Sequence, residues 1–168
     1  MDILLIMDAQ NSFLSESGSV YMGEKAEILK VRLVDLLSGF PKKKLFFREK
    51  HAEEDDFFTG ERTHSIATTD DTEVHKDLIK YADDFCYKTR YDAFFDTPFA
   101  PFLKRFGARH VGLAGLETHT SIMFTAESLR NIGYEVTVVE PCTMSRDDYM
   151  HNYAIALMRN FLGVRING

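Results

Sequence analysis

The chain has 168 residues, of which 45% are hydrophobic and 27% are charged, and these proportions are typical of one globular domain over residues 1–168. Its 20 basic and 26 acidic residues give a net charge of −6, which argues against a binder of nucleic acid or of an anionic membrane. The apolar runs are too short for a membrane span, the N-terminus lacks a basic signal-peptide start, and two cysteines make no disulfide framework, so we expect a cytoplasmic protein.

Short apolar runs alternate along the chain with longer segments of helical periodicity. We predict strands at residues 3–7, 44–48, 84–88, 111–116, 134–140 and, at an edge, 164–166. We predict a long polar loop at residues 50–75, and helices at residues 24–38, 75–82, 97–107, 119–131 and 146–161. This alternation predicts an α/β fold with three layers, in which a central, mostly parallel sheet of roughly six strands lies between helices.

Polar residues stand directly after several predicted strands, where parallel sheets bind their ligands. Asp8 follows the first strand and is either a proton-transferring carboxylate or an ordinary turn residue. Gln10 and Phe13 follow on the same exit loop and are candidate substrate contacts. Lys88 ends the strand 84–88 and is either a solvated lysine or an internal counter-ion that stabilises negative charge on a reacting group.

The segment 115–122 marks a change from strand to helix. Unpaired backbone N–H groups at a helix N-terminus carry partial positive charge, and they suit a developing oxyanion. Ser121 lies in this first turn, where it either caps the helix or occupies the position of an activated nucleophile.

Four segments together resemble the isochorismatase-like cysteine hydrolase superfamily, which includes nicotinamidases, N-carbamoylsarcosine amidases, ureidoacrylate amidohydrolases and biuret-type hydrolases. Residues 6–13 are similar to the family's Asp-Met-Gln-Asn-Asp-Phe opening, and residues 88–95 to the segment around its lysine. Residues 115–126 are similar to Gly-x-x-Thr-x-x-Cys-Val-x-x-Thr-Ala, and residues 138–146 to the strand and turn before the last helix. The four segments occur in the family's order and span nearly the whole chain.

The resemblance implies a catalytic triad of Asp, Lys and Cys, whose positions fall on Asp8, Lys88 and Ser121. In the family the thiolate attacks a carbonyl carbon to form an acyl-enzyme, while the aspartate takes the thiol proton and the lysine supports the charged site. The serine departs from this pattern, because an alcohol is much harder to deprotonate than a thiol and an aspartate is a weak base for it.

Three explanations of Ser121 are open. The serine is an engineered replacement that stops turnover, or a natural residue in a pseudoenzyme that binds a ligand or scaffolds an oligomer. Alternatively it is natural and active, with Asp8 protonating the substrate by a non-covalent route, as in the vinyl-ether hydrolases of the superfamily. His119 does not share a helical face with Ser121, and we interpret Cys86 and Cys142 as structural residues.

Glu49, His51 and His64 resemble the Asp-x-His pair and the later histidine with which nicotinamidases bind a divalent metal. One carboxylate and two imidazoles suit Zn²⁺, or Mn²⁺ or Fe²⁺. The alternative is a polar loop whose histidines only form hydrogen bonds. The covalent route itself requires no cofactor.

The resemblance also implies an oxyanion hole formed by the N–H groups of Glu117 and Ser121. In the family a cis peptide aims these groups, and it falls here between Leu116 and Glu117. Most relatives carry a small residue at position 117, so we expect the glutamate to reshape the pocket or to reach into it.

The sequence therefore predicts a hydrolase that cleaves a C–N bond of a small amide, carbamoyl or ureido compound, impaired as written if the thiol is essential. The alternatives are a non-catalytic binding or scaffolding protein and a vinyl-ether hydrolase. A dinucleotide-binding sheet is disfavoured, because no Gly-x-Gly-x-x-Gly follows the first strand. We expect a small-molecule substrate and neither nucleic acid nor a membrane as partner, and the resemblance implies a homo-oligomer, either a dimer or a tetramer.

Overall fold

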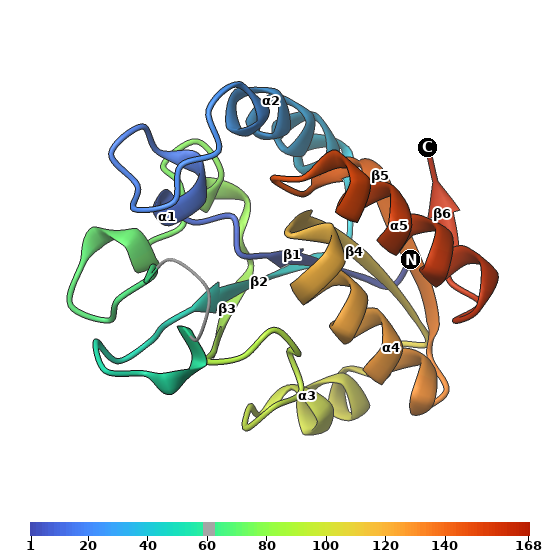
Figure 1. The fold of residues 1–168 in the computed structure, drawn as a ribbon. Helices are drawn as coiled ribbons and strands as arrows, with labels where there is room; N and C mark the ends of the chain where they lie inside the picture. The colour runs from blue at the N-terminus through green and yellow to red at the C-terminus, as the bar shows by residue number, and fades with distance from the viewer. Residues whose placement is uncertain (59–62) are drawn as a thin grey trace.

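The computed structural model describes residues 1–58 and 63–168, and its centre is one six-stranded sheet (Figure 1). The strands are β1 (Ile3–Met7), β2 (Lys43–Glu49), β3 (Asp84–Lys88), β4 (His110–Leu116), β5 (Glu135–Met144) and β6 (Arg165–Asn167). They lie in the order β3-β2-β1-β4-β5-β6, and every neighbouring pair is parallel. β6 is an edge strand, as the sequence predicted.

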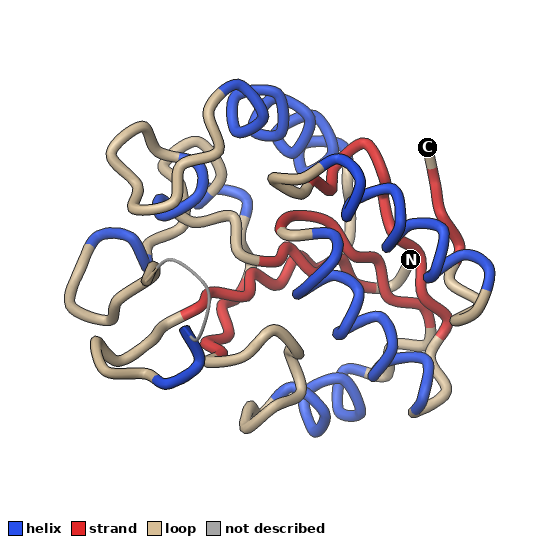
Figure 2. Tube along the Cα trace, viewed as in Figure 1, coloured by secondary structure: helices blue, strands red, loops and turns tan. Residues whose placement is uncertain are grey.

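Helices cover both faces of this sheet (Figure 2). The helices are α1 (Asn11–Leu14), α2 (Glu24–Gly39), α3 (Phe99–Phe106), α4 (Met123–Asn131) and α5 (Asp148–Asn160). α1 and α2 share one apolar core with one face of the sheet, and α3, α4 and α5 share a second core with the other face. The predicted α/β architecture with three layers is therefore confirmed.

The strand β1 shows why the sheet is buried on both sides. Successive side chains of a strand point to opposite faces. Ile3, Leu5 and Met7 pack with α3, α4 and α5, whereas Leu4 and Ile6 pack with α1 and α2. All five side chains are fully buried, which explains the continuous apolar run in the sequence.

Two predicted helices differ from the structure. The helix expected at residues 75–82 is only a 3₁₀ turn at Ile79–Tyr81, because most backbone bonds of this segment span three residues, as from Leu78 to His75 and from Ala82 to Ile79. The helix expected from residue 119 begins as α4 at Met123, because a π-helical turn occupies Thr118–Ile122.

The remaining differences in the element boundaries are small. α2 extends one residue past its predicted end, to Gly39, and β5 continues past Glu140 to Met144. In the 50–75 loop, the described residues contain only short 3₁₀ turns, at Asp56–Phe58 and Asp70–Thr72. The prediction of a long irregular segment there therefore holds for its described part.

A close approach of two strands shapes the carboxyl edge of the sheet. Gly115 of β4 pairs with Met7 of β1, and a Cβ atom at Gly115 would lie 2.1 Å from the carbonyl oxygen of Met7. Gly115 has φ of 109°, a conformation that favours glycine. Asp8, the next residue after β1, also has a positive φ, of 51°. This backbone turns Asp8 away from the sheet at the point where the neighbouring strands end.

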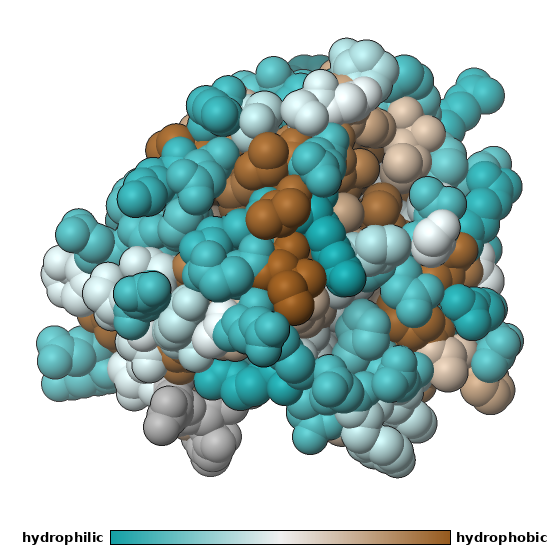
Figure 3. Space-filling view, turned by 90° about the horizontal axis from the view of Figure 1, so that it is seen from above, coloured by the Kyte–Doolittle hydropathy of each residue, from teal (hydrophilic) through white to brown (hydrophobic). Residues whose placement is uncertain are grey.

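The surface of the described residues mixes polar and apolar groups. Seen from above, apolar side chains gather near the middle of the face with polar groups around them (Figure 3). α2 contributes exposed apolar residues, with Ile28 39% and Val31 64% exposed. None of the helices in the described ranges has the length and apolar character that a bilayer crossing requires.

Candidate active site

A fully buried lysine joins three acidic and hydroxyl side chains at the carboxyl edge of the sheet. The Nζ of Lys88, at the end of β3, lies 2.9 Å from Oδ2 of Asp8 and 2.8 Å from Oε1 of Glu49. It also donates a hydrogen bond of 3.0 Å to Oγ of Ser121 in the turn after β4. The structure thus brings together the three residues proposed for the triad, which are far apart in the sequence.

The electrostatics of this cluster follow from its burial. Desolvation raises the pKa of Asp8 to about 7, and the negative charge of Glu49 adds to this, whereas Lys88 acts in the opposite direction. Burial alone would lower the pKa of Lys88, but the two carboxylates raise it above its ordinary value. Burial alone would likewise raise the pKa of Glu49, yet Lys88 and the two nearby histidines hold it well below its usual range. The cluster therefore retains one ammonium group and one firmly ionised carboxylate, while Asp8 exchanges its proton near neutral pH.

One oxygen of Asp8 is left for a ligand. Asp8 is only 1% exposed, and among the described residues its Oδ1 has no hydrogen-bond partner. A buried polar atom without a partner is costly unless a ligand or water satisfies it. Because Asp8 lines the pocket described below, this oxygen is placed to accept or give a substrate proton.

The π-helical turn Thr118–Ile122 presents Ser121 to Lys88, and two histidines tie the turn down. Thr118 Oγ1 lies 2.8 Å from Nδ1 of His151 on α5, and His119 Nδ1 lies 2.9 Å from Oγ of Ser145. The imidazole of His119 is therefore held on Ser145 and not on Ser121, as expected from two residues that do not share a helical face.

The predicted cis peptide is absent. The Leu116–Glu117 bond is trans, like every other peptide bond in the described ranges, so this prediction is wrong. A non-proline cis bond costs about 3 kcal/mol. Here the chain leaves β4 without it, through the positive φ of Gly115 and the π-helical turn that follows. The N–H groups of Glu117 and Ser121 remain predicted oxyanion donors.

A cavity of about 240 Å³ opens above the buried cluster. Asp8, Glu49 and Ser121 contribute to its lining. Phe13 also lines it, as the sequence predicted, and its ring meets that of His64 edge-on at 5.2 Å. The cavity is small, so it fits a compact substrate whose reactive group reaches Ser121 and Asp8.

Gln10, predicted as a substrate contact, has a different position. Its Nε2 donates to the carbonyls of Glu49 (2.9 Å) and Thr72 (3.1 Å), and its Oε1 accepts from the N–H of Glu49 at 2.7 Å. Gln10 is fully buried and does not belong to the lining of the pocket. Its amide is used by the backbone, so its role is to hold Glu49 in place.

One wall of the pocket carries an ion pair between Glu117, which the sequence predicted there, and Arg146, which it did not. Glu117 lines the cavity, as expected from its position, with a side chain that is 15% exposed. Its Oε2 accepts from the N–H of Arg146 at 3.3 Å, and its Oε1 lies 3.8 Å from the Arg146 guanidinium. That guanidinium also donates to the carbonyl of Val20 at 2.9 Å. The wall thus offers a substrate both a negative and a positive group.

Sequence reasoning missed several residues of the pocket. Tyr91, Thr120 and Arg146 line it, although none was a candidate. All three lie within the segments that resemble the family, which was the available signal. Nothing in their local sequence indicates which way their side chains point.

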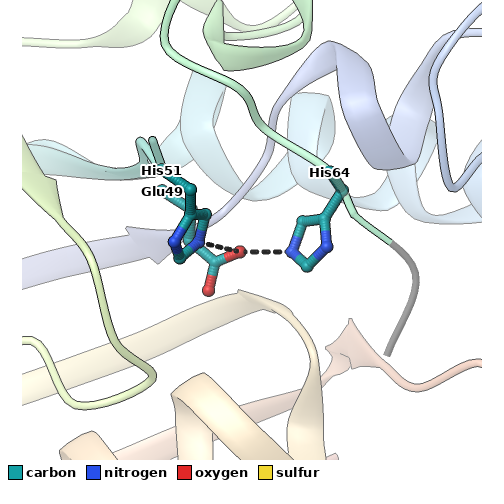
Figure 4. A group of neighbouring side chains, drawn as sticks. All are labelled: Glu49, His51 and His64. Carbon is teal, nitrogen blue, oxygen red and sulfur yellow. Dashed lines mark hydrogen bonds and ion pairs between the residues drawn. The ribbon is translucent and has the colours of Figure 1, made fainter. Parts of the chain in front are cut away.

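Glu49, His51 and His64 come together beside this cluster (Figure 4). One ligand atom from each lies within 4.8 Å of the others, and all three residues are buried. Oε2 of Glu49 is 2.8 Å from Nε2 of His64 and 3.8 Å from Nε2 of His51. Among the described residues, Nε2 of His51 is a buried atom without a hydrogen-bond partner. One carboxylate oxygen and two imidazole nitrogens converging in this way fit a divalent transition metal.

The two cysteines lie away from this chemistry. Burial raises the pKa of Cys86 to about 11, and it also raises the pKa of Cys142. Cys142 lies in β5, where its thiol is 3.3 Å from the carbonyl of Arg32 on α2. Neither thiol lines the pocket, so both are structural residues, as interpreted from the sequence.

Comparison with known proteins gives a consistent result. The family described as isochorismatase domain matches residues 2–167. The Bacillus subtilis protein YaaI, described as an uncharacterized isochorismatase family protein, is 28% identical over 85 residues, which are 51% of this chain and 47% of YaaI. The nicotinamidase/pyrazinamidase PncA from Bacillus subtilis has a crystal structure with a TM-score of 0.89 and 26% identity, covering 99% of this chain and 98% of that one.

The same fold recurs in N-carbamoylsarcosine amidase from Thermoplasma acidophilum, at 22% identity and a TM-score of 0.81, covering 98% of this chain and 94% of that one. The family match extends over nearly the whole length of the sequence. It agrees with the four segments and with the fold built from them. The chain therefore belongs to the isochorismatase domain family.

Proposed function

We propose that the protein is a hydrolase that cleaves a C–N bond of a small amide, carbamoyl or ureido compound at Asp8, Lys88 and Ser121. The observation that carries the proposal is the position of the Lys88 ammonium, 2.9 Å from Asp8 Oδ2 and 3.0 Å from Ser121 Oγ, beside a small cavity. Similar structures named as a nicotinamidase/pyrazinamidase and an N-carbamoylsarcosine amidase support an amide-type substrate.

In the covalent route Asp8 acts as the base. Its carboxylate takes the proton of the residue-121 side chain, whose heteroatom attacks the substrate carbonyl carbon. The carbonyl oxygen becomes an oxyanion that the N–H groups of Glu117 and Ser121 stabilise. Asp8 then gives its proton to the nitrogen, the C–N bond breaks and the amine leaves. Water, deprotonated by Asp8, hydrolyses the acyl-enzyme and regenerates the site.

Ser121 makes the first step of this route slow. The pKa of Asp8, about 7, makes it a better base than an ordinary carboxylate. It is still far below that of an alcohol, whereas a thiol with a pKa of about 8.5 is within reach. Lys88 makes proton transfer from Ser121 to Asp8 less unfavourable, because its hydrogen bond to Oγ stabilises negative charge on that oxygen. We therefore propose that the chain as written turns over weakly and that a cysteine at position 121 completes the site.

Glu49, His51 and His64 are proposed as ligands of a divalent metal. When bound, such an ion acts as a Lewis acid that holds and polarises a polar group of the substrate. Glu49 links the two parts of the site. Its Oε2 lies beside the histidines, and its Oε1 accepts a hydrogen bond of 2.8 Å from the Lys88 ammonium. The covalent steps at residues 8, 88 and 121 use only protein groups.

A second candidate rests on the state of Asp8. With a pKa of about 7 and an unpartnered Oδ1, Asp8 carries a proton in much of the population at neutral pH. A protonated Asp8 is a general acid, which is what non-covalent cleavage of a vinyl ether requires. That reaction needs no nucleophilic thiol, so a serine at position 121 is compatible with it.

The test compares ammonia release by the wild type and by Ser121→Cys from nicotinamide, pyrazinamide, N-carbamoyl amino acids, ureidoacrylate-like compounds and biuret. We expect the cysteine variant to release ammonia at least about a hundredfold faster from one class. Ser38→Cys is the control for an added thiol, since Ser38 is an exposed residue of α2. Asp8→Asn must abolish the gain. No release by either form, from any compound, contradicts the amidohydrolase proposal and favours a vinyl ether or a binding role.

A further inference from the structure

Asp55 stands behind His51, on the side of the imidazole that faces away from Glu49. We propose that Asp55, itself held by Arg90, fixes the tautomer of His51, with the proton on Nδ1 and the lone pair of Nε2 directed at the metal position. The inference rests on the proposed metal site, and it makes Asp55 a positioning residue that does not touch the metal.

The two ring nitrogens of His51 have different surroundings. Nδ1 lies 3.2 Å from Oδ2 of Asp55, at hydrogen-bonding distance. Nε2 lies 3.8 Å from the nearest Glu49 oxygen and has no hydrogen bond within the described residues. A neutral imidazole has one N–H, and an ionised carboxylate can only accept. The proton therefore belongs on Nδ1, where Asp55 accepts it, and Nε2 is left as the free donor of a lone pair.

Asp55 is held as a carboxylate by two other donors. Its Oδ2 accepts from Nη1 of Arg90 at 3.1 Å, and its Oδ1 accepts from the N–H of Phe57 at 2.9 Å. The side chain is 11% exposed. Both carboxylate oxygens of Asp55 thus accept from donors other than His51, and one of these donors is a permanently charged guanidinium. Asp55 is consequently an acceptor for His51 and not a donor to it.

The plane of the His51 ring is fixed as well. Phe57 stacks on the imidazole with ring centroids 5.4 Å apart and an interplanar angle of 9°. The Arg90 guanidinium lies 4.9 Å from the centroid of Phe57, and Phe58 meets His51 edge-on at 4.8 Å. His51 is fully buried in this packing. Arg90 thus acts on His51 in two ways, through Asp55 and through the ring of Phe57.

This arrangement has a direct consequence for metal affinity. A metal ligand must offer a deprotonated nitrogen, and a tautomer with the proton on Nε2 cannot bind until that proton moves. Partners of this kind behind a ligating histidine contribute about 10- to 100-fold to metal affinity. We expect the same range for Asp55.

The first experiment observes the tautomer in the metal-free wild type by ¹⁵N NMR of the histidine rings, with the His51 signals assigned from their loss in His51→Gln. The expected pattern is a protonated Nδ1 and an unprotonated Nε2. In Asp55→Asn this pattern must disappear or shift toward protonation of Nε2. A wild-type signature of the opposite tautomer, or of a doubly protonated ring at neutral pH, overturns the proposal without any variant.

The second experiment titrates Zn²⁺ into the same proteins by calorimetry. Asp55→Asn should bind about 10- to 100-fold more weakly. Asp56→Asn is the matched control, because Asp56 is the next residue, has a 97% exposed side chain and lies 3.7 Å from Nη2 of Arg90. Equal losses in both variants, or no loss in Asp55→Asn, overturn the proposal. If the wild type binds no zinc, the proposed metal site fails, while the NMR result still decides for or against Asp55.

Discussion

The site has two halves that meet at Glu49 and Lys88 but are built differently. The half with Asp8, Lys88 and Ser121 lies at the ends of three strands and is tied together through one ammonium group. The half with His51 and His64 lies on the loop that follows β2, and residues further out along that loop orient it. The reactive groups are therefore positioned by the sheet, whereas the candidate metal ligands depend on a longer loop and on Arg90, which holds that loop from the end of β3.

The largest effect is expected when the link between the halves is removed. Lys88→Met leaves two buried carboxylates without their shared cation, and breaking such a buried pair costs about 3–5 kcal/mol. We expect a loss of this size in the free energy of unfolding, measured in urea, and loss of ammonia release in the Ser121→Cys background. Lys42→Met removes a solvent-exposed ion pair and serves as the control. Equal effects of the two substitutions would show that Lys88 is not the shared counter-ion.

The next prediction tests the close contact between β1 and β4 at Gly115, on which the position of Asp8 depends. Gly115→Ala would place a Cβ atom 2.1 Å from the Met7 carbonyl oxygen at φ of 109°. Backbone strain and overpacking each cost about 1–3 kcal/mol, so we expect a loss of about 2–6 kcal/mol in the free energy of unfolding, measured in urea. Gly39→Ala is the matched control, because nothing lies within 4 Å of its added Cβ atom and it ends a helix. A neutral Gly115→Ala would mean that β1 and β4 are further apart than described.

A third prediction concerns the pH dependence of stability. The pKa of Asp8 is raised in the folded state to about 7 from an ordinary 3.8, in surroundings formed by Lys88, Glu49 and Ser121. The folded protein then binds a proton that the unfolded chain has released, so the contribution of Asp8 is full below about pH 4 and is lost as the pH rises through 7. The slope is at most about 1.4 kcal/mol per pH unit. Glu49 affects the stability only at lower pH, because its pKa in the folded protein is well below its ordinary value.

Urea unfolding of the wild type and of Asp8→Asn, with a chelator present, measures this slope between about pH 4 and 8. Asp8→Asn should lack the fall in stability that the wild type shows. The pH profile of activity separates the two candidate functions, since a base at Asp8 gives a rate that rises through pH 7 and an acid gives one that declines. Identical unfolding profiles in the two proteins would contradict the raised pKa.

The smallest expected effect concerns the pocket wall and tests whether Glu117 faces the substrate. Glu117→Gln removes the negative charge opposite Arg146 and keeps the shape of the side chain. In the Ser121→Cys background we expect glycinamide, a cation, to lose about tenfold in kcat/KM relative to neutral propionamide. Glu127→Gln on α4 is the control, since Glu127 does not line the cavity. An unchanged ratio would mean that Glu117 does not face the substrate.

Much of this molecule follows from local rules. The period of apolar residues predicts the strands and most helices, because it reports which side of each element is buried. The strand-end rule led to Asp8 and Lys88, and the structure brings these two residues together, since parallel strands end at one edge of the sheet. The turn from strand to helix pointed to Ser121, and the resemblance to a family added its role and the group of Glu49, His51 and His64; the structure places them at the same edge.

What the sequence by itself determined is therefore the order of strands and helices, the family and the residues that reach the carboxyl edge of the sheet. The tertiary structure alone decided the trans bond before Glu117 and the late start of α4, since His151 and Ser145 anchor that turn from elsewhere in the chain. It also decided that Gln10 supports the backbone and that Asp55 stands behind His51. The physical reason is the same in each case: a side chain's partner is set by packing between distant segments, and no local pattern carries that information.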